Sequence, residues 1–221
     1  MILNSMELFE KLINYNTLLN NDANKELLEK YTEIIQAEYI HFIPAVRFDS
    51  ALFLRLFAML TKPRNILEIG FGSGVSSYFI AEQLYEVDNF VSLERDTARY
   101  ERGKKIISQF NMNTVNLIHC DALEYLSNDD TMYDFIFIDA GKNDYTKYLH
   151  LIKDKLVTSG ILICDNTFFN ANVVKEESDI QKNHIKPTHS MKEFNTYLAN
   201  LKCFNTSFFV VGDGMSLSIK I

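Results

Sequence analysis

The stretch NILEIGFGSGV, from Asn65 to Val75, decides the fold. Its short apolar run, Ile66 to Ile69, ends in three glycines that are spaced two residues apart, Gly70, Gly72 and Gly74. Glycine accepts positive φ and lets a ligand approach the backbone closely, and a helix that begins after the loop points unpaired N–H groups into it. The pattern therefore predicts a strand, a tight loop and a helix start that contact a cofactor. A plain glycine turn is the alternative, because short glycine patterns also occur by chance.

Strand-like and helix-like segments alternate from this stretch onward, which predicts a parallel α/β sheet. The expected parallel strands are Ile66 to Ile69, Phe90 to Glu94, Val115 to His119, Phe135 to Ile138 and Ile161 to Cys164. The chain then closes with TSFFVV, the turn GDG at 212–214 and MSLSIKI, two β-rich runs that predict an antiparallel hairpin. We therefore expect a seven-stranded, mostly parallel sheet that ends in this hairpin.

The segment before the glycine stretch has apolar residues at helical spacing. Residues 1–61 are expected to form a helical cap, and residues 62–221 the core of the same single domain, 1–221. NNDAN at 20–24 is the expected break between the first two helices. One side of a third helix is expected to be buried, and it carries Leu52, Phe53, Leu56, Phe57 and Leu60.

Composition narrows the class of protein. The chain has 221 residues, 47% of them hydrophobic, enough for a sizeable core. The amino end lacks the basic start and apolar stretch of a signal peptide, so we expect a cytoplasmic protein that does not enter a membrane. Cys120, Cys164 and Cys203 are expected to be free thiols, because their spacing suggests neither disulfides nor zinc. A net charge of −7 disfavours broad nonspecific binding of nucleic acid.

Polar residues end every expected parallel strand, where ligands bind in open α/β sheets. Glu94 follows Gly70 by 24 residues, a position from which a carboxylate can bind both hydroxyls of a ribose. Val75 stands where a dinucleotide fingerprint has its third glycine, so S-adenosylmethionine is favoured over NAD. Glu68 inside the strand and Asp121, placed to meet an adenine amino group, fit the same cofactor. Glu94 and Asp121 could instead cap the helices that follow them.

Three oxygen ligands are expected to converge at two neighbouring strand ends. These are Asp139, Asp165 and Asn166, and such oxygens suit Mg²⁺ or Mn²⁺ with positions left open for water and substrate. A bound cation lowers the pKa of a coordinated hydroxyl, and Lys142 could take or balance the proton. The residues thus predict methyl transfer to a substrate hydroxyl. In the alternative the aspartates are helix caps and Lys142 is a surface charge.

Several motifs resemble those of the metal-dependent O-methyltransferases related to catechol and caffeoyl-CoA methyltransferases. They are LEIGFGSGVSS, SLERD, IDAGKNDY, CDN and VGDGMSLSIK, and they look most like the bacterial branch that methylates 5-hydroxyuridine in tRNA. The resemblance implies a Rossmann-like class I methyltransferase fold and a homodimer. It also implies metal ligation by Asp139, Asp165 and Asn166, and deprotonation assisted by Lys142. The implied cofactor site contains Glu68, Gly70, Ser76, Glu94, Asp121 and Ala122, which join Gly72, Gly74 and Asp139.

The methyl acceptor is where the chain departs from the tRNA-modifying branch. Asn170 stands where that branch usually has an arginine, and acidic residues at 176, 177 and 179 offset Lys175, Lys182 and Lys186. These charges argue against tRNA, but the closing motif VGDG favours it, with Arg47 as a further phosphate contact. A small catechol or phenol is the alternative. An NAD-dependent oxidoreductase and a noncatalytic nucleotide-binding module are less favoured. His184 and His189 are expected to be solvated loop residues, and Phe168 and Phe169 could wall an aromatic substrate.

Overall fold

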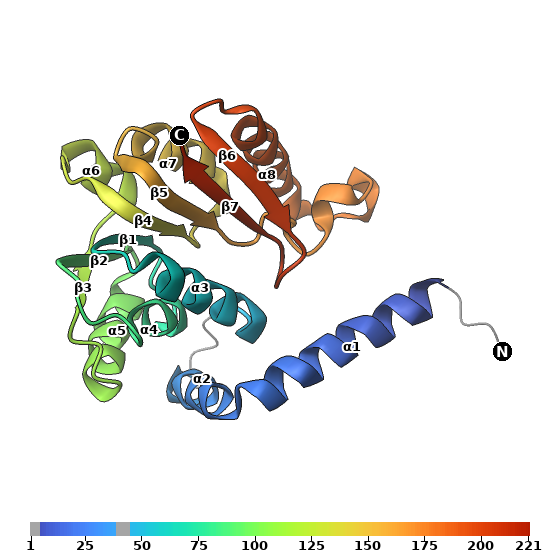
Figure 1. The fold of residues 1–221 in the computed structure, drawn as a ribbon. Coiled ribbons are helices and arrows are strands. Elements are labelled where there is room, and N and C mark those ends of the chain that lie inside the picture. The colour runs from blue at the N-terminus through green and yellow to red at the C-terminus, as the bar shows by residue number, and fades with distance from the viewer. Residues whose placement is uncertain (1–4, 39–44) are drawn as a thin grey trace.

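A seven-stranded sheet forms the centre of the computed structural model, which describes residues 5–38 and 45–221. The spatial order is β3-β2-β1-β4-β5-β7-β6, and only the pairs β5–β7 and β6–β7 are antiparallel (Figure 1). In chain order the strands are β1 (Asn65–Ile69), β2 (Asn89–Glu94), β3 (Val115–His119), β4 (Tyr133–Ile138), β5 (Leu156–Cys164), β6 (Phe204–Phe209) and β7 (Met215–Lys220). The predicted parallel strands and closing hairpin are confirmed.

Helices cover both faces of the sheet (Figure 1). The α-helices are α1 (Ser5–Ala23), α2 (Lys25–Glu38), α3 (Phe48–Thr61), α4 (Val75–Ala81), α5 (Thr97–Gln109), α6 (Ala122–Asn128), α7 (Tyr145–Ile152) and α8 (Lys182–Asn200). Short 3₁₀ helices are η2 (Lys142–Asp144), η3 (Asn172–Val174) and η4 (Glu177–Asp179).

The two faces of the sheet bury separate apolar cores. Strand residues alternate between the faces, so Ile66 packs with the helices that follow on one side while Leu67 packs on the other. The first core includes Leu54 of α3 and Phe79 of α4, and the second includes side chains of α6, α7 and α8 such as Phe194. Because the central strands are buried on both faces, their sequences are nearly continuous runs of apolar residues.

Two predictions about the helical cap need correction. In α3 the predicted Leu52 is buried and Phe53 and Phe57 are partly buried against the core, but the side chains of Leu56 and Leu60 are 62% and 75% exposed. Ala51, Leu54 and Ala58, which were not predicted, are also buried. Apolar residues surround most of this helix, so their spacing did not single out the buried side. The break between α1 and α2 is Asn24 alone rather than residues 20–24. Residues 1–4 and 39–44 of the predicted cap lie outside the described residues.

Helix α1 projects away from the sheet (Figure 1). Its side chains Leu8, Leu12, Tyr15 and Leu18 are between 60% and 62% exposed, although they recur at spacings that normally mark a buried side. Across residues 5–38 and 45–221, no helix is both long and apolar enough to cross a membrane. All three cysteines are free, as expected, and only Cys164 is fully buried.

The position of β7 brings the turn before it to the carboxyl end of β5. Because β7 runs antiparallel to β5, its first residues lie beside the last residues of β5, with Cys164 paired to Ser216. The turn that precedes β7, residues 211–214, therefore lies next to Asp165 and Asn166. Backbone hydrogen bonds from Thr167 N to Gly214 O (3.0 Å) and from Phe168 N to Asp213 O (3.0 Å) join the two segments.

Candidate active site

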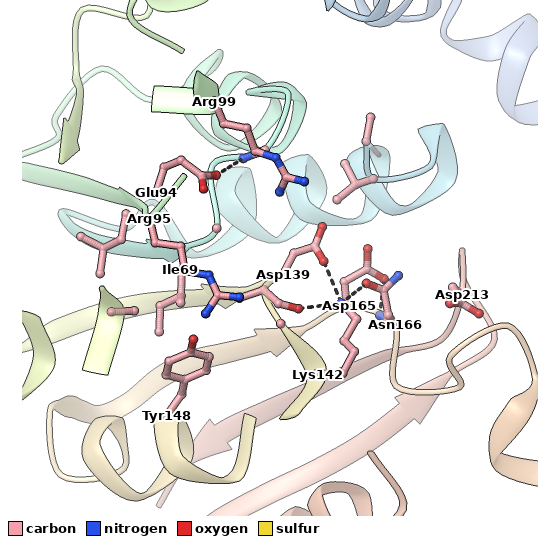
Figure 2. A pocket seen from close by; sticks show the side chains of 18 of the residues that line it. Ile69, Glu94, Arg95, Arg99, Asp139, Lys142, Tyr148, Asp165, Asn166 and Asp213 are labelled. Atoms are coloured by element: carbon pink, nitrogen blue, oxygen red, sulfur yellow. Dashed lines mark hydrogen bonds and ion pairs between the residues drawn. The ribbon is translucent and has the colours of Figure 1, made fainter. Parts of the chain in front are cut away.

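A cavity of about 580 Å³ opens at the carboxyl ends of the parallel strands. Figure 2 shows Glu94, Arg95 and Arg99 at one end of it and Asp139, Lys142, Asp165, Asn166 and Asp213 toward the other. For clarity we name three parts of its lining. The glycine wall consists of Gly70, Gly72, Glu94 and Ala122, the polar cluster of Asp139, Lys142, Asp165 and Asn166, and the hairpin wall of Arg47, Phe169, Asn170 and Asp213.

The backbone of the glycine wall requires glycine at its first position. Gly70 has φ +100°, and a Cβ built on it would lie 2.1 Å from the carbonyl oxygen of Asp139. Glu94 closes the loop from the neighbouring strand, because its two carboxylate oxygens accept hydrogen bonds from Gly72 N (3.2 Å) and Asp96 N (2.9 Å). The loop is thus held close to β4 without a side chain between them.

Glu68 lies beneath the glycine loop rather than in the cavity. Its buried carboxyl group accepts hydrogen bonds from Ser76 Oγ (2.5 Å), Ser92 Oγ (2.5 Å) and Ser77 Oγ. Burial raises the pKa of Glu68 to about 7, although the three serine hydroxyls act in the opposite direction. This carboxyl group therefore ties β1 to β2 and to the start of α4, and it supports the loop from below.

The polar cluster joins the ends of β4 and β5. Lys142 Nζ lies 3.1 Å from Asp139 Oδ1 and also donates to Asn166 Oδ1, while Ala140 O (3.1 Å) and the Tyr145 hydroxyl (3.2 Å) complete its surroundings. The lysine side chain is mostly buried, so its stem is fixed by packing as well as by these oxygens. One cationic group thus faces the two strand ends that carry the predicted metal ligands.

The two carboxylates of this cluster belong to Asp139 and Asp165, and the charge of Asp139 acts on Asp165. Burial, and after it the charge of Asp139, raise the pKa of Asp165 to about 7. A bound cation would offset both effects. Within the described chain, no group of three or more His, Cys, Asp or Glu side chains could hold a metal ion, so a metal site at these strand ends would need the amide of Asn166 as a third donor. Two carboxylates and an amide form an all-oxygen donor set that fits a hard divalent cation.

The hairpin wall is assembled from three distant parts of the chain. Arg47 precedes α3, Phe169 and Asn170 follow β5, and Asp213 belongs to the turn before β7. Asp213 Oδ1 accepts a hydrogen bond from Asn170 N (2.6 Å), and Gly212 N donates to Asp49 Oδ2 (3.1 Å) in the first turn of α3. The turn between β6 and β7 therefore contacts both other segments of this wall.

Most of the site residues expected from the sequence line the cavity. These are Gly70, Gly72, Glu94, Ala122, Asp139, Lys142, Asp165 and Asn166. Four others lie outside its lining: Glu68, Gly74, Ser76 and Asp121. Gly74 is the N-cap of α4, and the Asp121 side chain caps α6 by accepting from Leu123 N and Glu124 N. As cofactor ligands these four stay predictions.

Sequence reasoning missed several lining residues. Arg95 directly follows Glu94, so its position after a strand end was a usable signal. Tyr148, inside α7, carried no such signal, and Asp213 was seen only as part of a turn. His184 and His189 lie in α8 rather than in the predicted loop, and neither lines the cavity. His189 is exposed and pairs with Glu177 (2.9 Å), and His184 is partly buried against the ring of Phe169. Phe169 lines the cavity, whereas Phe168 packs under Gly214.

The strand order, the glycine loop and the acidic residue that ends β2 define the class of protein, a Rossmann-like methyltransferase. The chain belongs to the O-methyltransferase family, whose sequence pattern matches residues 19–221. This assignment favours the methyltransferase interpretation over the NAD-dependent oxidoreductase and the noncatalytic module.

Individual relatives agree with the family. The chain is 26% identical to Tapetum-specific methyltransferase 1 of Arabidopsis thaliana over 202 residues, which cover 89% of this chain and 87% of that protein. It is 28% identical to a caffeoyl-CoA O-methyltransferase of Populus kitakamiensis over 184 residues, which cover 80% and 78%. Among solved structures, a proposed caffeoyl-CoA O-methyltransferase of Staphylococcus aureus superposes with a TM-score of 0.83 at 25% identity, covering 94% of this chain and 98% of that one.

Proposed function

We propose that this protein transfers a methyl group from S-adenosylmethionine to a hydroxyl group that is bound to a divalent cation, Mg²⁺ or Mn²⁺. The observation that carries the proposal is the placement of Asp139, Lys142, Asp165 and Asn166 around one end of a cavity whose other end is the glycine wall. A helix-cap role explains each carboxylate singly but does not explain why a lysine and an amide face the same point.

The residues have separate roles in this proposal. Gly70, Gly72, Glu94 and Ala122 would hold the cofactor, with Glu94 facing its ribose, and Asp139, Asp165 and Asn166 would hold the cation. When bound, S-adenosylmethionine supplies the methyl group and the cation lowers the pKa of a hydroxyl that it coordinates. Lys142 is placed to take the proton or to balance the charge of the oxygen that has lost it.

Cofactor and metal can be tested separately on the purified protein. Calorimetric titration should detect binding of S-adenosylhomocysteine and not of NADH, and the opposite result would reject the methyltransferase proposal for this chain. Methyl transfer to a catechol or 5-hydroxyuridine probe should stop in excess chelator and return with added Mg²⁺ or Mn²⁺. Full activity in chelator would remove the metal from the mechanism while leaving the cofactor assignment intact.

We propose 5-hydroxyuridine in tRNA as the acceptor, because its 5-hydroxyl oxygen lies next to the C4 carbonyl oxygen and both could reach one cation. The motif resemblance and Arg47 at the cavity support this choice. A small catechol, which has two adjacent hydroxyl oxygens, or a phenol, which has one, is the second candidate. One observation favours the second candidate. Lys175 donates to Asn170 O (3.2 Å) and Asn172 Oδ1 (2.9 Å), so its ammonium group is already hydrogen-bonded within the protein and is less free to contact a tRNA phosphate.

Nucleoside analysis separates these acceptors. If tRNA is the substrate, cells without this protein should lose 5-methoxyuridine and accumulate its hydroxyl precursor, and binding to tRNA should weaken steeply with added salt. An unchanged nucleoside profile, together with methylation of small catechols by the purified protein, would assign the second candidate.

We also propose that the protein works as a homodimer in which α1 contributes to the interface. Most of a helix's stability in a protein comes from the packing of its apolar face, and among the described residues the apolar side chains Leu8, Leu12, Tyr15 and Leu18 of α1 stay exposed, on a helix that projects from the body (Figure 1). Light scattering should give twice the chain mass, and Leu12→Glu should shift the protein toward the monomer. A monomeric wild-type protein at micromolar concentration would refute this proposal.

A further inference from the structure

The turn at residues 211–214 makes more contacts with the loop after β5 than a simple β-connection needs. Asp213 contributes twice, because its backbone oxygen accepts from Phe168 N (3.0 Å) and its side-chain Oδ1 accepts from Asn170 N (2.6 Å). Gly214 O accepts from Thr167 N (3.0 Å). Three closely spaced amides of the loop are therefore held by one turn.

The loop that is held in this way has an unfavourable backbone. Asn166, Phe169, Asn170 and Ala171 all have positive φ, between 45° and 57°, although none is glycine. A residue with a Cβ is disfavoured in this region, and several such residues in one loop persist only where the surroundings fix them. The Asp213 side chain supplies a bond to the middle of that run, at Asn170.

Both ends of this loop face the cavity. Asn166, at its start, belongs to the polar cluster, and Phe169 belongs to the hairpin wall. Asp213 is itself half-buried, and Figure 2 shows it beyond Asn166, at the edge of the polar cluster. A change at Asp213 would therefore reach the cavity through the loop, without disturbing the glycine wall on the other side.

The same turn is fixed from its other side. Gly212 N donates to Asp49 Oδ2 (3.1 Å), and a Cβ built on Gly212 would lie 2.1 Å from Ser50 Oγ, so this turn packs directly on the start of α3. With the turn anchored on α3, the carboxylate of Asp213 has a fixed point from which to hold Asn170.

We infer that Asp213 is a positioning residue for methyl transfer: its bond to Asn170 N holds the left-handed loop so that the Asn166 amide and the Phe169 ring face the cavity together. The inference rests on the function proposed above. It assigns Asp213 no contact with the reacting atoms, and it predicts that the side-chain acceptor matters while the negative charge does not.

Matched variants separate these two properties. Asp213→Asn keeps an acceptor oxygen at the same distance from Asn170 N, whereas Asp213→Ala removes it. Asp213→Ser has a hydroxyl group, but the serine side chain is too short for it to reach Asn170 N. Thr206→Ala serves as the control, because Thr206 bonds Ser218 in the same hairpin and lies away from the cavity. The serine variant preserves a polar group at the turn in case the alanine variant fails to fold.

We expect Asp213→Ala and Asp213→Ser to weaken Mn²⁺ binding, measured by calorimetry on the full chain, by about tenfold, the usual effect of losing one hydrogen bond. Acceptor KM should rise by a similar factor, with S-adenosylhomocysteine affinity unchanged. Asp213→Asn and Thr206→Ala should stay within about twofold of wild type. Equal losses in Asp213→Asn and Asp213→Ala would overturn the inference, since the charge would then be what matters, and so would no loss in any variant.

Amide exchange keeps this test independent of the proposed function. The Asn170 amide should exchange slowly in the wild type and in Asp213→Asn, and rapidly in Asp213→Ala and Asp213→Ser. If the wild type neither binds Mn²⁺ nor methylates any acceptor, the proposed function fails, while this exchange pattern still reports whether Asp213 holds the loop. Rapid exchange of Asn170 in the wild type would refute the positioning role itself.

Discussion

The glycine wall and the hairpin wall face each other across one cavity but are built in different ways. Gly70, Gly72 and Glu94 come from one continuous β1-loop-α4-β2 stretch, whereas the hairpin wall joins segments that start at Arg47, Phe169 and Asp213. The first is held by hydrogen bonds between adjacent strands, the second by bonds such as Asn170 to Asp213, 43 residues apart. Under the proposed function, the cofactor would bind to a wall built mainly from one continuous stretch, while the opposite wall depends on distant segments meeting correctly.

The largest expected effect is chemical and separates the two walls. Lys142→Met should lower the methyl-transfer rate by about 10²- to 10⁴-fold, the range for loss of a proton-transfer group, and leave the affinity for S-adenosylhomocysteine unchanged. Lys147→Met is the control, because Lys147 is exposed and pairs only locally with Asp144 (2.7 Å). Rate measurements and calorimetry on both variants suffice. If Lys142→Met kept the wild-type rate, or lost cofactor affinity together with the rate, Lys142 would not act in methyl transfer separately from cofactor binding.

Gly70 is the point at which the glycine wall contacts the end of β4. A side chain at this position should therefore disturb both the glycine wall and the end of β4. Gly70→Ala places a Cβ 2.1 Å from Asp139 O in a backbone with φ +100°, which should cost roughly 3 kcal/mol of unfolding free energy. Gly141→Ala, whose Cβ would meet only the end of the Arg95 side chain at 3.3 Å, should be nearly neutral. Denaturant unfolding measures both, and equal stabilities would contradict the close approach.

Glu68 gives the glycine wall a pH dependence of its own. Because its folded pKa is raised from 4.5 to about 7, the stability linked to its neutral form is complete below pH 4.5 and is lost as the pH rises through about 7. Glu68→Gln stays neutral at every pH. Between pH 5 and pH 8 its free energy of unfolding should therefore fall by about 1–3 kcal/mol less than that of the wild type. The exposed Glu124→Gln is the control. Parallel stability curves for Glu68→Gln and wild type would show that Glu68 is ionised throughout.

The smallest effect tests the edge of the glycine wall. Asp121→Ala removes two hydrogen bonds to the first turn of α6 and should cost about 1 kcal/mol of stability, while Asp121→Asn keeps the cap. Since Asp121 lies outside the cavity lining, affinity for S-adenosylhomocysteine should stay unchanged in both. A clear loss of affinity in Asp121→Ala would instead support its predicted contact with the adenine.

The local features of the fold could be predicted from the sequence because strand, turn and helix signals are short-range. For that reason, polar residues at the expected strand ends correctly predicted that Glu94, Asp139, Asp165 and Asn166 line the cavity. A rule about strand ends does not identify the hydrogen-bond partners of Glu68, because its partner Ser92 is set by the register between β1 and β2. Nor could it place Asp213, whose neighbours depend on where β7 inserts in the sheet. The neighbours of Glu68 and Asp213 depend on how distant strands pair, and a local sequence pattern carries no information about that pairing.

The insertion of β7 between β5 and β6 also has a consequence for biosynthesis. Until β7 pairs with it, β5 presents the apolar run Ile161–Cys164 as an open edge, the kind of surface that promotes aggregation. The same strand brings Asp213 to the cavity, so a nascent or proteolytically shortened chain that ends before β7 lacks the hairpin wall as well. Such a chain would keep its glycine wall and could still capture cofactor, yet it would be exposed to chaperones and proteases. The covering of the β5 edge and the completion of the cavity lining thus depend on the same strand.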